Sequence, residues 1–238
     1  IRERKALQEQ ILKTQRLEAI KQLATMVAHD LRNPLAGIRN AAYYIKRKLG
    51  NADQTIREML EIIDREVVFA NDIVNDLLDF ASDRPLELKL ESINSLIEET
   101  LRLIQIPENI EVIKEFEEIP KIYVDANRLK RVFKNLIENS IQAMPKGGKL
   151  TIKTRKNEDS IEIIFKDTGV GISKENMKKI FTPFFTTKAK GVGIGLSICK
   201  KFVKEHNGEI RVESEEGKGS VFTVILPIKK LKGGERHE

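Results

Sequence analysis

The chain has 238 residues, of which 40% are hydrophobic and 33% charged, and its formal net charge is +6. These values fit a globular protein of one large or two small domains. Acidic and basic residues are interleaved and only 5% are aromatic, so no nucleic-acid partner is expected. The single cysteine excludes a disulfide framework. No apolar run is long enough to span a membrane and no signal peptide is visible, so we expect a cytoplasmic fragment, whether or not the full-length protein is membrane-anchored.

Residues 1–82 predict two helices joined by a turn at 50–55. Apolar residues recur in alternating steps of three and four along 17–49 and again along 56–81, which is heptad spacing. A flanking apolar stripe widens the face of the second helix. Two antiparallel helices cannot bury such wide faces alone, so we expect a homodimer that forms a four-helix bundle. The alternative is a monomeric hairpin packed on the rest of the chain.

The stretch "AHDLRNPLAG" at 28–37 puts polar residues and a proline inside the first helix. His29 lies about 200° around the helix from the apolar seam, so its imidazole is expected to point to solvent. Pro34 has no backbone N–H and is expected to kink the helix after the histidine. A neutral, exposed imidazole is a competent nucleophile, and a carboxylate such as Asp30 can orient it. A solvated histidine beside a tolerated proline fits this motif equally well.

A proline-containing linker at 83–87 precedes residues 88–230, in which the hydrophobic period changes. The predicted helices are 92–106, 126–144, 173–180 and 194–206, the predicted strands are 109–117, 149–156 and 160–167, and a C-terminal hairpin and a frayed tail at 231–238 follow. Strands grouped with helices, without strict alternation, predict an α/β two-layer sandwich.

Two polar motifs in this second segment suit a nucleotide. In "NLIENSIQA", Asn135 and Asn139 share one helix face, and amide oxygens can bind a hydrated magnesium ion. In "DTGVGIS", Asp167 ends a strand and can accept a hydrogen bond from an exocyclic amine such as that of adenine. Gly169 and Gly171 let the backbone approach a flat ring. Taken singly, each motif is also compatible with a solvated helix face or an ordinary strand–turn–helix.

A third motif, "FTPFFTTKAKGVGIGLS" at 181–197, places Gly191, Gly193 and Gly195 before a helix. It is not a dinucleotide fingerprint, because no core strand precedes the glycines. It is not a Walker A loop, because no Gly-Lys-Ser/Thr follows. A mobile lid that closes over a triphosphate fits better.

In this order the motifs resemble the H-box, N-box, first glycine box, F-box and second glycine box of sensor histidine kinases of two-component systems. The resemblance covers nearly the whole chain and implies that His29 is phosphorylated. It also implies that residues 1–82 form the dimerisation and phosphotransfer domain. Residues 88–230 would then be an ATP-binding domain of the superfamily of gyrases, heat-shock chaperones, kinases and mismatch-repair proteins (the GHKL or Bergerat fold).

Carried over by position, the resemblance implies that Asn135 and Asn139 hold Mg²⁺ and that Asp167 reads the adenine amino group. The other ATP-binding residues would be Gly169, Gly171, Lys188, Gly191, Gly193, Gly195 and Leu196. Ala143 and Gln142 depart from the pattern, because some members have an aromatic residue and a lysine there.

For the phosphotransfer domain, the resemblance implies that Asp30 orients His29 and assists its deprotonation. Asn33 would position a water when the kinase dephosphorylates its partner. The expected activity is ATP-dependent autophosphorylation of His29, followed by phosphoryl transfer to an aspartate of a response-regulator receiver domain. An upstream sensor domain is expected to precede this fragment. The alternatives are an ATP-hydrolysing clamp with the same nucleotide fold and a catalytically inactive dimeric scaffold.

Overall fold

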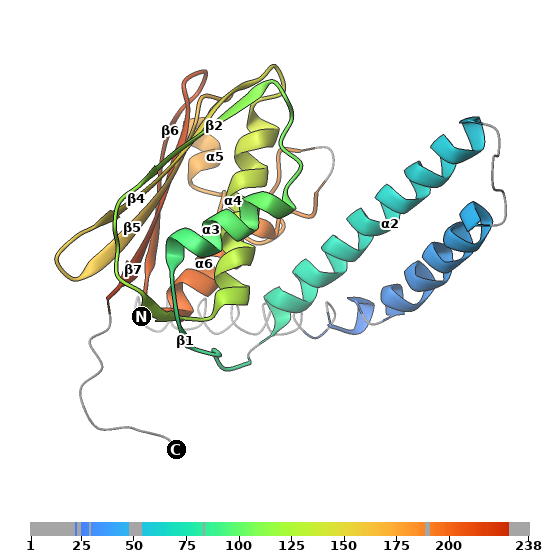
Figure 1. Cartoon of the computed structure of the whole chain (residues 1–238), viewed down its shortest axis with the longest axis horizontal. Helices are drawn as coiled ribbons and strands as arrows, with labels where there is room; N and C mark the ends of the chain where they lie inside the picture. Colours follow the sequence, from blue (N-terminus) through green and yellow to red (C-terminus); the bar gives the residue numbers. More distant parts are fainter. Residues whose placement is uncertain are drawn as a thin grey trace, which may run out of the picture. The chain divides into compact units, whose positions relative to one another are not determined.

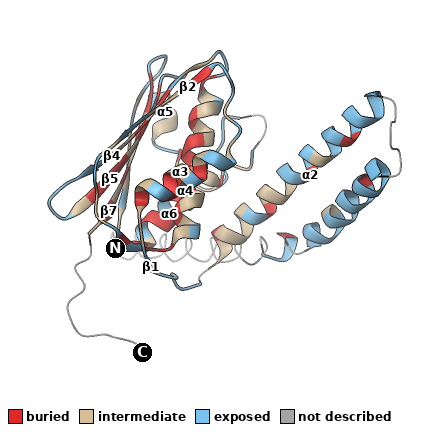
Figure 2. Cartoon of the chain, viewed as in Figure 1, coloured by how far each residue is buried: buried red, intermediate tan, exposed pale blue. Residues whose placement is uncertain are grey.

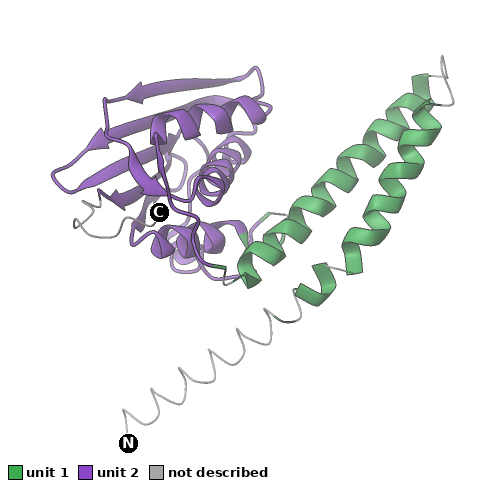
Figure 3. Cartoon of the chain, turned by 60° about the horizontal axis from the view of Figure 1, so that its bottom comes forward, with its two compact units in different colours: residues 1–84, 188–194 green, residues 85–187, 195–238 purple. Residues whose placement is uncertain are grey.

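The computed structural model describes residues 22, 25–28, 30–47, 54–82, 84–188 and 191–228. The chain divides into two compact units (Figure 3). The first consists of residues 1–84 and 188–194, and the second of residues 85–187 and 195–238.

The first unit contains a helical hairpin (Figure 1). Its first helix is described over residues 30–47 and continues through Pro34. The second helix is α2 (Gln54–Ala81). The predicted pair of helices is therefore confirmed, while residues 48–53, which hold most of the predicted turn, lie outside the described residues.

The hairpin of a single chain leaves much of its apolar seam exposed (Figure 2). Leu60, Val67 and Val74 of α2 are buried, as the heptad pattern requires. In the first helix, however, Leu31 and Ile38 expose 43% and 49% of their surface. An apolar stripe of this length on a helix surface is typical of a face that another protein surface covers.

The second unit contains a five-stranded mixed sheet in the order β2-β4-β5-β7-β6 (Figure 1). The strands are β2 (Ile110–Phe116), β4 (Gly148–Lys156), β5 (Ser160–Asp167), β6 (Glu209–Glu215) and β7 (Gly219–Pro227). β2 and β4 are parallel and the other neighbours are antiparallel. The helices α3 (Ile93–Leu103), α4 (Ala126–Ala143) and α6 (Gly195–Glu205) form the second layer. The predicted two-layer sandwich is confirmed.

The core lies between these two layers (Figure 2). Alternate residues of β5, namely Ile161, Ile163 and Phe165, are fully buried. On α4, Phe133 is fully buried and its ring centroid lies 5.9 Å from that of Phe165. Burial of each such side chain contributes about 1.5–3 kcal/mol, so this contact fixes the face that α4 turns toward the sheet.

Two parts of the second unit differ from the sequence predictions. The helix predicted at 173–180 is a single turn, α5 (Lys174–Met177), capped by Ser173. A separate two-stranded sheet, β1 (Lys89–Glu91) with β3 (Ile122–Val124), was not predicted. Three-residue strands are too short to show a period of two. Among the described residues, no helix is both long and apolar enough to cross a membrane.

Candidate functional site

Helix α4 turns an apolar face to the sheet and a polar face away from it. Asp125 caps the helix, because its Oδ1 accepts a hydrogen bond from the Arg128 backbone N–H at 3.1 Å. The residues on its apolar face are all buried: Leu129, Phe133, Leu136, Ser140 and Met144. Asn135 and Asn139 are half-buried on the other side, so the structure gives both amides the shared face that the spacing predicted.

The start of α6 lies against this polar face. The Asn135 Nδ2 lies 3.4 Å from the carbonyl oxygen of Gly195, the first residue of α6. A Cβ at Gly195 would lie 3.4 Å from Asn135 Oδ1. That distance is an ordinary van der Waals contact, so this approach does not require a glycine. The structure nevertheless brings together two predicted residues that are 60 positions apart in the sequence.

Asp167, at the end of β5, is a buried carboxylate with only 2% of its surface exposed. Its Oδ1 accepts hydrogen bonds from the backbone N–H groups of Gly169 at 2.9 Å and Ser220 at 3.2 Å. Burial raises the pKa of Asp167, and these two hydrogen bonds oppose the shift. The nearby Ser140 hydroxyl also favours the charged form, although its geometry falls short of a hydrogen bond. Both backbone donors therefore bind Oδ1, and neither binds Oδ2.

Two predicted glycines are required by the close packing around Asp167. A Cβ at Gly169 would lie 2.5 Å from the carbonyl oxygen of Ala143, at the end of α4. Gly171 has a φ of +69°, and a Cβ there would lie 2.1 Å from the carbonyl oxygen of Glu215. The first glycine box is therefore held between α4 and β6, so its backbone shapes the surface beside the carboxylate.

Sequence reasoning missed three residues next to Asp167: Ser140, Gly219 and Ser220. Gly219 has a φ of +97°, and a Cβ there would lie 2.1 Å from the Asp167 carbonyl oxygen. For Gly219 and Ser220 the signal was the "GKGS" stretch at 217–220, where the last strand begins. That stretch reads as an ordinary hairpin turn until the register shows that β7 pairs with β5.

The predicted lid is partly described. Gly191 and Gly193 have φ values of +136° and +72°, which favour glycine. Lys188 is exposed and Leu196 is half-buried, and residues 189–190 lie outside the described residues. The phosphate contacts of Lys188 and the lid glycines stay predictions.

The H-box is described except at its centre. His29 lies outside the described residues, whereas Asp30 and Asn33 are helical and exposed on either side of Arg32. The Arg32 guanidinium donates a hydrogen bond to Asn75 Oδ1 at 3.2 Å. A groove of about 400 Å³ opens at this point between the two helices of the hairpin. Its lining residues are Arg32, Ala36, Arg39, Asn40, Val68, Asn71, Asp72 and Asn75.

Comparison with known proteins finds relatives of both units. Residues 19–85 match the family model described as the His Kinase A (phospho-acceptor) domain. Residues 124–230 match the family model described as the histidine kinase-, DNA gyrase B-, and HSP90-like ATPase. Sporulation kinase C of Bacillus subtilis (strain 168) is 36% identical over 242 residues, which cover 96% of this chain and 56% of that protein. The chain spans between 32% and 56% of the length of the first curated relatives it matches.

Two solved structures extend the comparison. The catalytic domain of histidine kinase ThkA is 35% identical with a TM-score of 0.55, and the match covers 60% of this chain and 96% of that one. Histidine kinase ThkA in complex with response regulator protein TrrA is 30% identical with a TM-score of 0.65, covering 94% of this chain and 66% of that one. Since both family models and these structures match, the chain belongs to the sensor histidine kinases of two-component systems.

Proposed function

We propose that this chain binds ATP in the second unit and transfers its γ-phosphoryl group to His29. The observation that carries the proposal is the buried Asp167 carboxylate, with one oxygen held by backbone N–H groups and the other left for a purine amine. The half-buried amides of Asn135 and Asn139 lie on the polar face of α4, one turn apart. We assign residues 1–82 to dimerisation and phosphotransfer, and residues 88–230 to ATP binding.

The donor set of α4 fits magnesium delivered with the nucleotide. Amide oxygens are hard ligands that suit Mg²⁺ together with phosphate oxygens and water. Among the described residues, no group of three or more His, Cys, Asp or Glu side chains is placed to hold a metal ion. Asn135 and Asn139 would therefore complete the coordination of a cation that ATP brings. When bound, the metal neutralises phosphate charge during transfer.

In the transfer step, a neutral imidazole nitrogen of His29 attacks the γ-phosphorus in line with the leaving oxygen of ADP. The N–P bond forms as the P–O bond to ADP breaks, and the imidazole proton passes to the Asp30 carboxylate or to water. Catalysis rests on positioning and charge neutralisation more than on covalent chemistry by other side chains. Asp30 adjoins the histidine on the exposed side of the helix, where it can orient the ring.

The exposed apolar face of the hairpin supports a homodimer. Leu31 and Ile38 of the first helix are 43% and 49% exposed, and Met59 of α2 is 55% exposed. A second copy that packs its own hairpin against these residues would complete a four-helix bundle. The phosphoacceptor motif would then lie on the outside of a rigid bundle.

The groove beside the H-box supports docking of a response regulator. Arg32, three residues after His29, lines it, and the lining residues are polar except for Ala36 and Val68. The ThkA structure was determined with a response regulator bound. Here an aspartate of the bound receiver would take the phosphoryl group from His29. Asn33, exposed on the same helix, would position a water for the reverse task of dephosphorylating the partner.

The decisive experiment is incubation with γ-labelled ATP and magnesium. A kinase gives a protein-bound label that is acid-labile, base-stable, absent from His29→Ala and present in the matched control His237→Ala. An ATPase clamp would consume ATP and leave the protein unlabelled. An inactive scaffold would do neither, and either of these results would refute the proposal. Asn139→Ala should prevent labelling while the dimer persists.

A further inference from the structure

A buried histidine that the proposed chemistry does not use lies at the far end of α6. His206 is 5% exposed, and both of its ring nitrogens are engaged. Nε2 accepts a hydrogen bond from the Asp125 backbone N–H at 2.9 Å, and Nδ1 lies 2.7 Å from the carbonyl oxygen of Phe202. Since Nε2 is an acceptor, the ring proton must be on Nδ1 and the imidazole must be neutral.

Asp125 joins this histidine to the linker. Its backbone N–H donates a hydrogen bond to His206 Nε2. Its Oδ1 caps α4 by accepting a hydrogen bond from the Arg128 N–H. Its Oδ2 accepts a hydrogen bond at 3.2 Å from the backbone N–H of Glu87, in the linker that follows the helical hairpin. One buried residue therefore connects the linker, the start of α4 and the end of α6.

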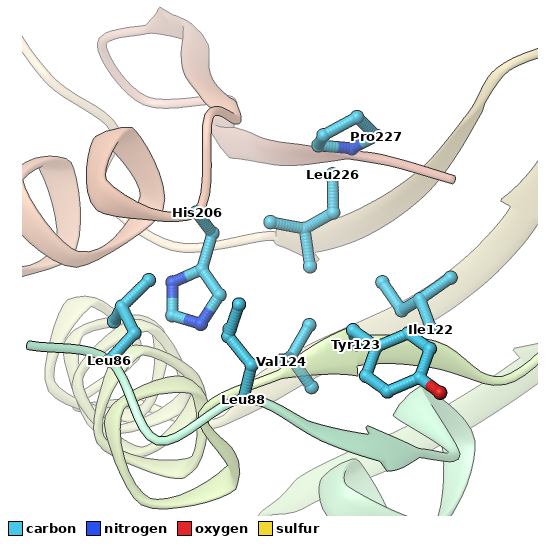
Figure 4. A pocket seen from close by; sticks show the side chains of 8 residues that line it. All are labelled: Leu86, Leu88, Ile122, Tyr123, Val124, His206, Leu226 and Pro227. Atoms are coloured by element: carbon cyan, nitrogen blue, oxygen red, sulfur yellow. The ribbon is translucent and has the colours of Figure 1, made fainter. Parts of the chain in front are cut away.

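The linker also packs beside the imidazole. Leu86 and Leu88 lie on either side of the ring, and together with Val124 and Leu226 they line a small, partly open pocket of about 10 Å³ (Figure 4). The hydrogen bond from the Asp125 N–H to His206 is buried, and the bond from the Glu87 N–H to Asp125 is partly buried. An unmade hydrogen bond in such a place costs about 1–3 kcal/mol, so linker and imidazole are expected to stay ordered together or loosen together.

The charges around the ring come from α4 and α6. Arg128 forms an ion pair with Glu205, and its Nε lies 3.7 Å from Asp125 Oδ2. Tyr123 is the titratable side chain that β3 adds to the cavity wall, whereas β7 contributes Leu226 and Pro227. Burial lowers the pKa of His206 and outweighs the nearby Asp125 and Glu205 carboxylates. A second ring proton would bind Nε2 and turn it into a donor. It would then face the Asp125 N–H, which is also a donor, so the hydrogen bond between them would be lost.

We propose that His206 and Asp125 form a proton-sensitive latch that fastens linker residues 85–88 to the ATP-binding domain. The neutral imidazole keeps the latch closed, and a proton on Nε2 removes the bond to Asp125 and releases the linker. A closed latch holds the chain from residue 85 onward on the ATP-binding domain, which shortens the tether after α2. Release adds four residues, which extend it by about 13 Å.

The direct test is amide hydrogen exchange of the Glu87 N–H, measured by NMR from pH 7.5 to 4.5 and corrected for intrinsic exchange. The range extends well below the ordinary imidazole pKa because burial lowers the pKa of His206. In the wild type, protection should fall at least about tenfold on acidification, which corresponds to loss of one hydrogen bond. In His206→Gln, an uncharged side chain that can still accept from Asp125, protection should stay constant. The latch would be refuted if protection of the Glu87 N–H in the wild type did not change with pH, or if it fell equally in His206→Gln.

Asp125→Ser is a second, independent variant. A serine hydroxyl preserves the α4 cap but lacks the second oxygen that holds Glu87. Glu87 protection should therefore be low at every pH, while the backbone N–H at position 125 keeps its pH dependence through His206. Unchanged Glu87 protection in this variant would refute the proposed contact, even if His206→Gln failed to fold.

The effect on phosphoryl transfer rests on the proposed kinase function and is tested separately, at one fixed pH. The longer tether in Asp125→Ser should raise the rate of His29 labelling at saturating ATP at least about twofold, with an unchanged KM for ATP. An unchanged or lower rate would refute this gating role. Absence of labelling in the wild type would instead refute the kinase proposal and leave the exchange result standing.

Discussion

Replacing Asp167 by asparagine is the sharpest test of the purine site. The substitution changes one oxygen to an NH₂ group and leaves the shape of the side chain intact. Gly169 and Ser220 both donate to Oδ1, so the asparagine should keep its oxygen there and turn its NH₂ toward the ligand. A hydrogen bond to a charged acceptor contributes about 1.5–3 kcal/mol, and we expect ATP affinity to fall by about 10- to 150-fold.

The assay is calorimetric titration with ATP and with GTP. The 6-oxo group of guanine can accept from the new NH₂, so Asp167→Asn should lose ATP affinity while its preference for ATP over GTP narrows or reverses. Asp159→Asn is a matched control, because Asp159 is exposed in the turn between β4 and β5. Wild-type ATP affinity in Asp167→Asn would refute the assignment of Asp167 to the purine amine.

The same substitution should raise the folding stability of the nucleotide-free protein, although it lowers its affinity for ATP. Burial raises the pKa of Asp167 above 3.8, so the charged form is the costly one in the folded state. The favourable contribution of the protonated acid is present below 3.8 and is lost as the pH rises through the raised pKa. Asparagine carries no charge at any pH. In thermal unfolding without nucleotide, the Tm of Asp167→Asn relative to the wild type should therefore be higher at pH 7 than at pH 4. A larger relative Tm at pH 4 would contradict this account.

Three further predictions concern packing, assembly and dephosphorylation. Gly169→Ala places a Cβ 2.5 Å from the Ala143 carbonyl oxygen, so we expect a loss of about 1–3 kcal/mol in urea unfolding and weaker ATP binding; wild-type values would show that the loop adjusts freely. Ile38→Glu puts a charge on the exposed apolar face and should shift light scattering toward the monomer, whereas a persisting dimer would place the interface elsewhere. Asn33→Ala should slow loss of phosphate from the response regulator without slowing autophosphorylation, and equal dephosphorylation rates would remove Asn33 from the mechanism.

Periodicity was sufficient to predict the long elements. The spacing of Leu129, Phe133 and Leu136 fixed both the extent and the buried face of α4, because those side chains share one side of a helix. By contrast, β1 and β3 are three residues each and pair across 35 positions, so no local pattern marks them.

The candidate site could be predicted only where a motif carries its own chemistry. Asn135 and Asp167 stood out because amides and a carboxylate recur at spacings that suit a nucleotide. Ser220 and Gly219 did not, because their role depends on the pairing of β7 with β5, which is a contact between distant parts of the chain. His206 was equally hidden, since its partner Asp125 is 81 positions away in the sequence.

The way in which Asp167 is held has a consequence for how this pocket can change over evolution. Its orientation comes from main-chain amides, which every residue except proline supplies. Side chains such as Val170, which is 59% exposed, are therefore free to drift without moving the carboxylate. An inhibitor that pairs with Asp167 would meet few escape substitutions, because resistance would have to come from the acid itself or from the glycines that bring the backbone to it.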